Sequence, residues 1–144
     1  MVNLLKSPAQ LSARRGTLVL CNALATAAFS GVAIDGASGH HSRDFFYFFL
    51  WFVWVVTTLL WTFGIPGFFR WSAAERATVN DELVRAHQAS AAKGGFLTAI
   101  VGLGLLSASA FFRVALPGWS VIALASLTVV SSALIFAWLE RRDG

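Results

Sequence analysis

Four long apolar segments without a single Asp, Glu, Lys or Arg constrain this 144-residue chain more than any other feature. They cover residues 16–34, 45–63, 94–112 and 119–138. An α-helix needs about 20 residues to cross the roughly 30 Å hydrocarbon core of a bilayer, so each segment is long enough. Lipid offers the backbone no hydrogen-bond partners, and such segments must therefore be helical. The sequence predicts an all-α, polytopic membrane protein with four transmembrane helices.

The positive charges predict the orientation of these helices. Of the 11 Lys and Arg, all but Arg43 and Arg113 lie before the first segment, between the second and third, or after the fourth. Short loops rich in Lys and Arg remain in the cytoplasm. We therefore expect a multi-pass protein of the inner or plasma membrane with both termini cytoplasmic. The net charge of +4 then needs no nucleic-acid partner, and membrane lipids are the expected neighbours of the cations.

The chain is short enough that we expect one integral membrane domain, residues 1–144. Ser7 can cap a helix, and Pro8 suits its first position, so a helix should begin there and run into the first span. Residues 72–93 are the largest soluble piece. No Pro interrupts residues 80–112, which predicts a helical extension of the third span, with Gly94 and Gly95 as its expected bend. Short connections favour antiparallel neighbours and hence a four-helix bundle.

Most of the aromatic residues lie in and just after the second segment, where several fall into one helical stripe. The stripe comprises Tyr47, Trp51, Trp54, Thr58 and Trp61, spaced four and three residues apart. One hypothesis is a flat surface that receives a ring-bearing or polyene ligand, or a helix of a partner. The alternatives are packing within the bundle and exposure to lipid.

Polar side chains lie at similar depth in three of the segments. The set comprises Asn22, Thr57, Thr58, Ser131 and Ser132. Such groups hydrogen-bond across helices at about 0.6–2 kcal/mol each. We expect Asn22 to face the bundle interior and to bond to Thr58 or Ser131 as a helix–helix contact. A substrate site would normally also need an ionisable group, and none lies in the four segments.

Small residues on the first and third segments predict close helix packing. They are Ala23, Ala27 and Gly31 on the first segment, and Gly104 and Ala108 on the third. Small residues four apart let helix backbones approach closely. They could join these two helices within one chain, or two chains in a dimer.

The soluble parts offer weaker candidates. Asp81, Glu82 and Arg85 form a mixed-charge segment that could dock a partner, or simply a solvated extension of the third span. His87, on the same extension, is interpreted as a solvated residue. His40 and His41 lack the further ligands that a transition-metal site needs, and the single cysteine, Cys21, has no partner for a disulfide. We therefore expect no metal and no cofactor.

These patterns favour one class of function over two others. An enzyme is the poorest fit, because catalysis uses paired titratable groups in a protected pocket, and here such groups are expected only in loops and tails. The best fit is a non-catalytic accessory, assembly or scaffold subunit of a larger membrane complex, with other membrane subunits or copies of itself as partners. The alternative is a small oligomeric transporter or channel for a neutral or lipid-like substrate.

Overall fold

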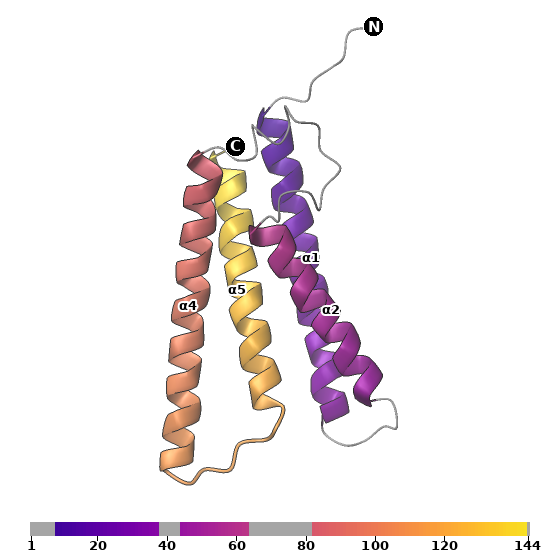
Figure 1. Cartoon of the computed structure of the whole chain (residues 1–144), viewed down its shortest axis with the longest axis vertical. Coiled ribbons are helices and arrows are strands. Elements are labelled where there is room, and N and C mark those ends of the chain that lie inside the picture. Colours follow the sequence, from indigo (N-terminus) through magenta and orange to yellow (C-terminus); the bar gives the residue numbers. More distant parts are fainter. Residues whose placement is uncertain (1–7, 38–43, 64–81, 144) are drawn as a thin grey trace, which may run out of the picture.

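The computed structural model describes residues 8–37, 44–63 and 82–143, and these residues form four helices (Figure 1). They are α1 (Pro8–Ala37), α2 (Asp44–Phe63), α4 (Glu82–Phe111) and α5 (Ser120–Asp143). Each contains a stretch that is long and apolar enough to cross a membrane. The prediction of an all-helical fold with four helices long and apolar enough to span a membrane is therefore confirmed for the described residues. The start of the first helix at Pro8 is confirmed as well.

Helix α5 is the centre of the arrangement. It packs along α1 and α4 and also touches α2, while α2 lies mainly along α1 (Figure 1). Within the described residues, α4 has no comparably extensive contact with α1 or α2. The helices therefore do not close into a ring, and α4 forms one edge of the molecule.

One end of the molecule gathers three helix termini. Helices α1 and α4 begin there, and α5 ends there (Figure 1). We call it the charged end, because Arg14, Arg15, His87, Glu140 and Arg141 all lie in these terminal turns. It is also the end at which the four helices hold the most buried side chains.

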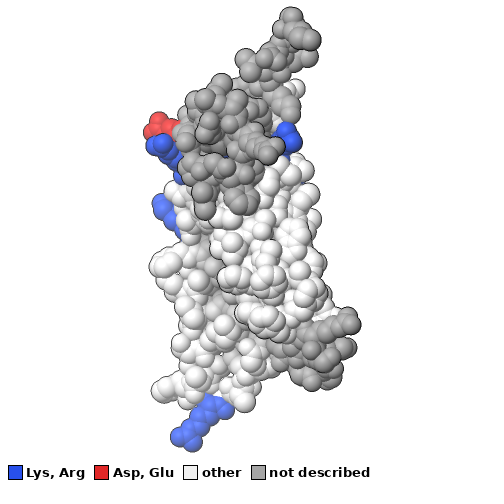
Figure 2. Space-filling view, turned by 45° about the vertical axis from the view of Figure 1, so that its right-hand side comes forward, with Lys and Arg blue, Asp and Glu red and all other residues white. Residues whose placement is uncertain are grey.

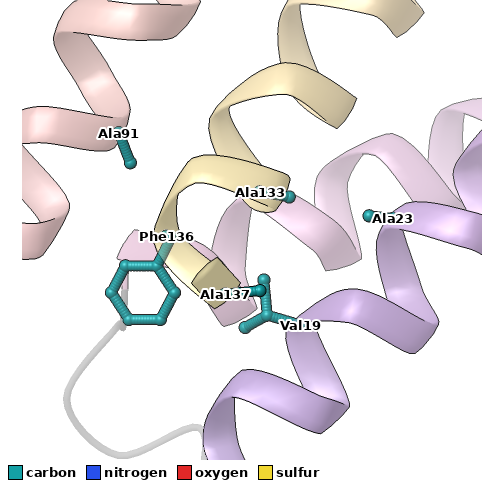
Figure 3. Close-up of a cluster of buried hydrophobic side chains, with 6 residues drawn as sticks. All are labelled: Val19, Ala23, Ala91, Ala133, Phe136 and Ala137. Atoms are coloured by element: carbon teal, nitrogen blue, oxygen red, sulfur yellow. The ribbon is translucent and has the colours of Figure 1, made fainter. Parts of the chain in front are cut away.

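The apolar core brings together side chains from three helices (Figure 3). Its buried members are contributed by α1, α4 and α5: Val19, Ala23, Ala91, Ala133, Phe136 and Ala137. Alanine lets helix backbones approach closely, and Phe136, which is fully buried, fills the space between the three helices. Two partly buried side chains, Trp61 and Val84, pack against this cluster.

Glycines on α4 bring it close to α5. A Cβ atom on Gly95 would collide with the Ser132 hydroxyl, and one on Gly102 would collide with a methyl group of Leu124. Gly94, beside Gly95, faces Ile135 in the same way. The helix runs without interruption through all three positions. The glycine pair at which a bend was predicted therefore serves as a contact surface between two helices.

The small residues predicted to join the first and third spans are placed differently. Ala23 is buried in the core, whereas Ala27, Gly31, Gly104 and Ala108 are exposed. Neither Gly31 nor Gly104 has any neighbour within 4 Å of where a Cβ atom would stand. Helix α4 instead reaches α5 through Gly94, Gly95 and Gly102. The alternative that these exposed small residues join two chains stays a prediction.

Helix α4 ends in a left-handed turn. Arg113 has a φ of 56°, and the amide of Val114 donates to the carbonyl of Ser109 at 2.8 Å. Such a conformation at a helix C-terminus is usually taken by glycine, because a side chain crowds the following carbonyl. The turn redirects the chain toward α5, which begins at Ser120 with its hydroxyl donating to the carbonyl of Pro117 at 2.7 Å.

Candidate functional site

A buried carboxylate connects three helices at the charged end. Glu140 on α5 is only 1% exposed. One of its oxygens, Oε1, lies 3.0 Å from Nδ1 of His87 on α4. The other, Oε2, accepts a hydrogen bond of 2.8 Å from the hydroxyl of Ser12 on α1, which also lies 2.9 Å from the Glu140 carbonyl. Both carboxylate oxygens therefore hold a donor from a neighbouring helix.

Helical spacing explains why these residues meet. His87, Ala91 and Gly95 are four residues apart, and together they are the buried face of α4. Phe136 and Glu140 are likewise four apart on α5, so the carboxylate stands one turn beyond the largest core side chain. On both α4 and α5, therefore, small or apolar residues face the core, and the residue one turn closer to the charged end is polar.

Arg15 completes this group, which we call the Glu140 cluster: Ser12, Arg15, His87 and Glu140. Arg15 is 5% exposed, and its guanidinium carbon lies 4.7 Å from the centroid of the Phe136 ring. A cation over an aromatic face is attracted by the negative centre of the ring. Its Nη1 atom is buried and has no hydrogen-bond partner. The cluster thus combines a satisfied carboxylate with an incompletely satisfied guanidinium.

Two exposed arginines follow Glu140 at the end of α5. Arg141 Nη2 lies 3.4 Å from the hydroxyl of Thr17 on α1, and Arg142 stands over the ring of Trp138 at 4.8 Å. Figure 2 shows charged atoms toward the two ends of the molecule and a broad uncharged zone between them. This distribution is the one expected of helices that cross a membrane.

The structure corrects the sequence interpretation of His87. That residue was expected to be solvated, but it is 4% exposed and pairs with Glu140. The expectation that titratable groups lie only in loops and tails is also wrong, since Arg15, His87 and Glu140 lie within helices. Sequence reasoning missed Ser12, Arg15 and Glu140 entirely. The four-residue spacing of His87 from Ala91 and Gly95 was the available signal, because it extends the small-residue face of α4.

The aromatic stripe of α2 faces the protein's own helices. Trp51 is buried, and its indole donates to the hydroxyl of Ser126 on α5 at 2.8 Å. Trp54 stacks on Phe29 of α1, with ring centroids 5.6 Å apart. Thr58 is fully buried, Trp61 packs against the core, and Tyr47 is partly buried. The opposite, exposed face of α2 carries Phe45, Phe46, Phe48, Phe49 and Phe52. The positions of the stripe residues are those of bundle packing.

The predicted polar layer is a set of separate pairs. Thr58 on α2 lies 2.7 Å from Thr26 on α1, and its hydroxyl also donates to the backbone carbonyl of Asn22 at 3.2 Å. Asn22 is buried as expected, but its side-chain amide donates to the Leu18 carbonyl of its own helix. Thr26 was not among the predicted residues.

The other members of the predicted layer either contact one neighbouring helix or hydrogen-bond within their own helix. Ser131 on α5 donates to Thr98 on α4 at 3.2 Å. Ser132 is buried against Gly95, while the Thr57 hydroxyl donates to the Val53 carbonyl of its own helix. The polar groups therefore contribute pairwise links, α1 to α2 and α4 to α5, rather than one continuous layer.

The remaining candidates lie at or beyond the edges of the described structure. Glu82 and Arg85 are exposed at the start of α4, whereas Asp81, His40 and His41 lie outside the described residues. Within the described ranges, no group of three or more His, Cys, Asp or Glu is placed to hold a metal ion. No protein-family model, curated protein or solved structure matches this chain.

Proposed function

We propose that this protein is a non-catalytic accessory, assembly or scaffold subunit of a larger membrane complex. The observation that carries the proposal is the unequal burial of its helices. In the most apolar stretch of α4 only 6% of the residues are buried, against 33% in α1, 22% in α2 and 33% in α5. Within the described residues, a helix of this length that packs extensively against α5 alone offers a long surface to a helix of another subunit.

The free surface is concentrated in the second half of α4. The buried residues of this helix, His87, Ala91 and Gly95, all lie in its first half. The following turns expose large apolar side chains together with small ones: Phe96, Leu97, Val101, Leu105, Gly104 and Ala108. Lipid does not drive helices together by itself, so helices associate in membranes where small residues permit close packing. We call residues 96–111 the free half of α4.

The Glu140 cluster supports a structural role over a catalytic one. Both oxygens of its carboxylate are engaged by Ser12 and His87, which belong to different helices. A catalytic acid or base instead presents its atoms to a substrate within hydrogen-bond reach. The contacts of Glu140 hold the ends of α1, α4 and α5 together and so fix the position from which α4 extends.

The proposed orientation has the charged end in the cytoplasm. Arg14, Arg15, Arg85, Arg141 and Arg142 lie toward this end, and Arg113 lies at the opposite end of α4. This distribution supports a cytoplasmic location under the positive-inside rule. A reporter fused after residue 144 is expected to be active only on the cytoplasmic side, and activity outside the cell would overturn the orientation.

Site-specific photo-crosslinking in membranes of the native host tests the proposed function. A photoreactive amino acid replaces Val101 in the free half of α4, and in the control it replaces Leu24 on α1. These side chains are matched in exposure, at 62% and 61%. We expect position 101 to give a product of defined mass with another membrane protein, and position 24 to give mainly lipid adducts. Lipid adducts alone at both positions would contradict the proposal.

The same experiment separates the two candidate functions. A product between two copies of this chain at position 101 would favour the alternative, a small oligomeric transporter or channel for a neutral or lipid-like substrate. Gly104→Leu sharpens the distinction, because it enlarges the free half of α4 at a position with open space around it. Gly31→Leu on α1, where the space is also open, is the matched control. We expect only Gly104→Leu to abolish the product with the partner.

A further inference from the structure

Arg15 is a buried cation whose hydrogen bonds are not all made. Its Nη1 atom is enclosed by protein and has no partner, the one such side-chain atom among the residues that the structure describes. A buried donor without an acceptor is unfavourable, and more so when it carries charge. The position therefore favours any acceptor that can reach it.

The nearby carboxylate does not supply that acceptor. Oε1 of Glu140 is engaged by His87, and Oε2 is engaged by Ser12. Glu140 contributes its negative charge to the surroundings of Arg15 without satisfying Nη1. Phe136 contacts the guanidinium through the face of its ring, which attracts the cation but accepts no hydrogen bond in the guanidinium plane.

The surroundings of Arg15 are suited to an anion. Arg141, which follows Glu140 in the sequence, is exposed. Thr17 on α1 adds a hydroxyl group that lies 3.4 Å from Nη2 of Arg141. The described charged end carries more cations than carboxylates, and it lies where the apolar helices give way to charged residues. This is the level at which phospholipid headgroups stand beside a membrane protein.

The geometry points to Arg15 as a binding residue for a phosphate group, supplied by the headgroup of an anionic phospholipid. A guanidinium binds phosphate oxygens through charge-assisted hydrogen bonds in its own plane. Basic pockets between helices on the cytoplasmic side of membrane proteins recognise headgroups in this way. The inference is independent of the proposed accessory function, since a lipid site serves a subunit and a transporter equally well.

Lipid retention by the full-length protein tests this site. The protein is reconstituted in nanodiscs of phosphatidylcholine with a minor fraction of phosphatidylglycerol, released into mild detergent, and analysed by native mass spectrometry. We expect the wild type to retain phosphatidylglycerol selectively and Arg15→Gln to lose about tenfold in that selectivity, as for one charge-assisted contact. Arg14→Gln, which removes the neighbouring exposed cation, is expected to retain it like the wild type.

Four outcomes decide the inference. Equal loss of selectivity in Arg14→Gln and Arg15→Gln would overturn it, because binding would then follow net charge rather than this side chain. The thermal unfolding temperature of the protein is also compared in pure phosphatidylcholine nanodiscs with added inorganic phosphate and in nanodiscs that contain phosphatidylglycerol. If inorganic phosphate raises this temperature and phosphatidylglycerol does not, the lipid source is overturned and the site binds free phosphate. If Arg15→Gln does not fold, Arg15→Lys keeps the charge but loses the planar donors. Weaker phosphatidylglycerol retention by Arg15→Lys than by Arg14→Lys then supports the site, and equal retention overturns it.

Discussion

The two halves of α4 differ in both composition and contacts: the first half carries Glu82, Arg85 and Lys93, and the second half carries no charged residue. In the first half, His87, Ala91 and Gly95 are buried against α5, and His87 pairs with Glu140. In the second half no residue is buried, although Gly102 still contacts Leu124 and Thr98 accepts a hydrogen bond from Ser131. Apolarity alone therefore does not decide which part of a membrane helix packs. Helices in lipid associate where small residues permit close approach and polar groups find partners. The first half of α4 has two adjacent glycines against α5 and a buried polar pair, whereas the second half has one glycine contact and one part-buried hydroxyl pair.

Helix α2 supports the same conclusion from a different chemistry. It has large aromatic side chains on all sides, yet only one face is buried. That face is the one on which Trp51 reaches Ser126 and Thr58 reaches Thr26. The exposed phenylalanines on the opposite face are equally apolar but have no polar partner to orient them.

The largest effect should follow from removing the carboxylate that ties the first half of α4 to its neighbours. Glu140→Ala leaves Ser12 and His87 without their shared acceptor and Arg15 without a nearby negative charge. Breaking a buried pair by removing one partner costs about 3–5 kcal/mol. Unfolding of the detergent-solubilised protein by increasing SDS measures the loss. Asp35→Asn, which changes an exposed acid on α1, is the control. A Glu140→Ala protein as stable as this control would show that the cluster contributes little.

The next largest effect should be a difference in stability between two glycine substitutions, one in each half of α4. Gly95→Val forces a side chain into Ser132 and should cost about 1–3 kcal/mol, as overpacking does. Gly104→Val meets open space and should leave stability nearly unchanged. The comparison uses the same SDS titration on both variants. Equal losses would mean that helix propensity, rather than contact with α5, dominates both positions.

Adjacent threonines on α2 test the contribution of interhelical hydrogen bonds. Thr58→Val removes the hydroxyl that reaches Thr26 and the Asn22 carbonyl, at a cost of about 1 kcal/mol. Thr57→Val is the matched control, because the Thr57 hydroxyl bonds only to its own helix. Asn22→Leu should also be mild, since the amide of Asn22 returns to Leu18. A larger loss in Asn22→Leu than in Thr58→Val would restore the side chain of Asn22 as the main link.

The smallest expected effect is an increase in stability from a substitution at the C-terminal end of α4. Arg113 adopts a left-handed conformation, so Arg113→Gly should stabilise the protein by up to about 1 kcal/mol. Arg113→Ala removes the charge but keeps the strain, and it serves as the control. Equal midpoints of SDS unfolding for the two variants would argue against strain at this turn.

Part of the candidate site was within reach of the sequence. The stripe from Tyr47 to Trp61 was predicted to share one helix face, and its members Trp51, Trp54, Thr58 and Trp61 do contact neighbouring helices. The buried position of Asn22 was also predicted. The Glu140 cluster was not, because its residues are far apart in the chain and each alone resembles a solvated terminal residue. Ser12 and Glu140 meet only because α1 begins at the end of the molecule where α5 stops.

The sequence by itself determined the helical class of this protein and the approximate extent of the four helices that are long and apolar enough to span a membrane. Those properties depend on apolar composition over about 20 residues and on backbone hydrogen bonding, which are local. Only the tertiary structure decided that α5 is central, that Gly95 and Gly102 contact it, and that Gly104 is left open. The reason is that helices apolar on every side carry little periodic signal for choosing a partner. Their pairing depends instead on how small residues and polar groups on different helices happen to match in depth.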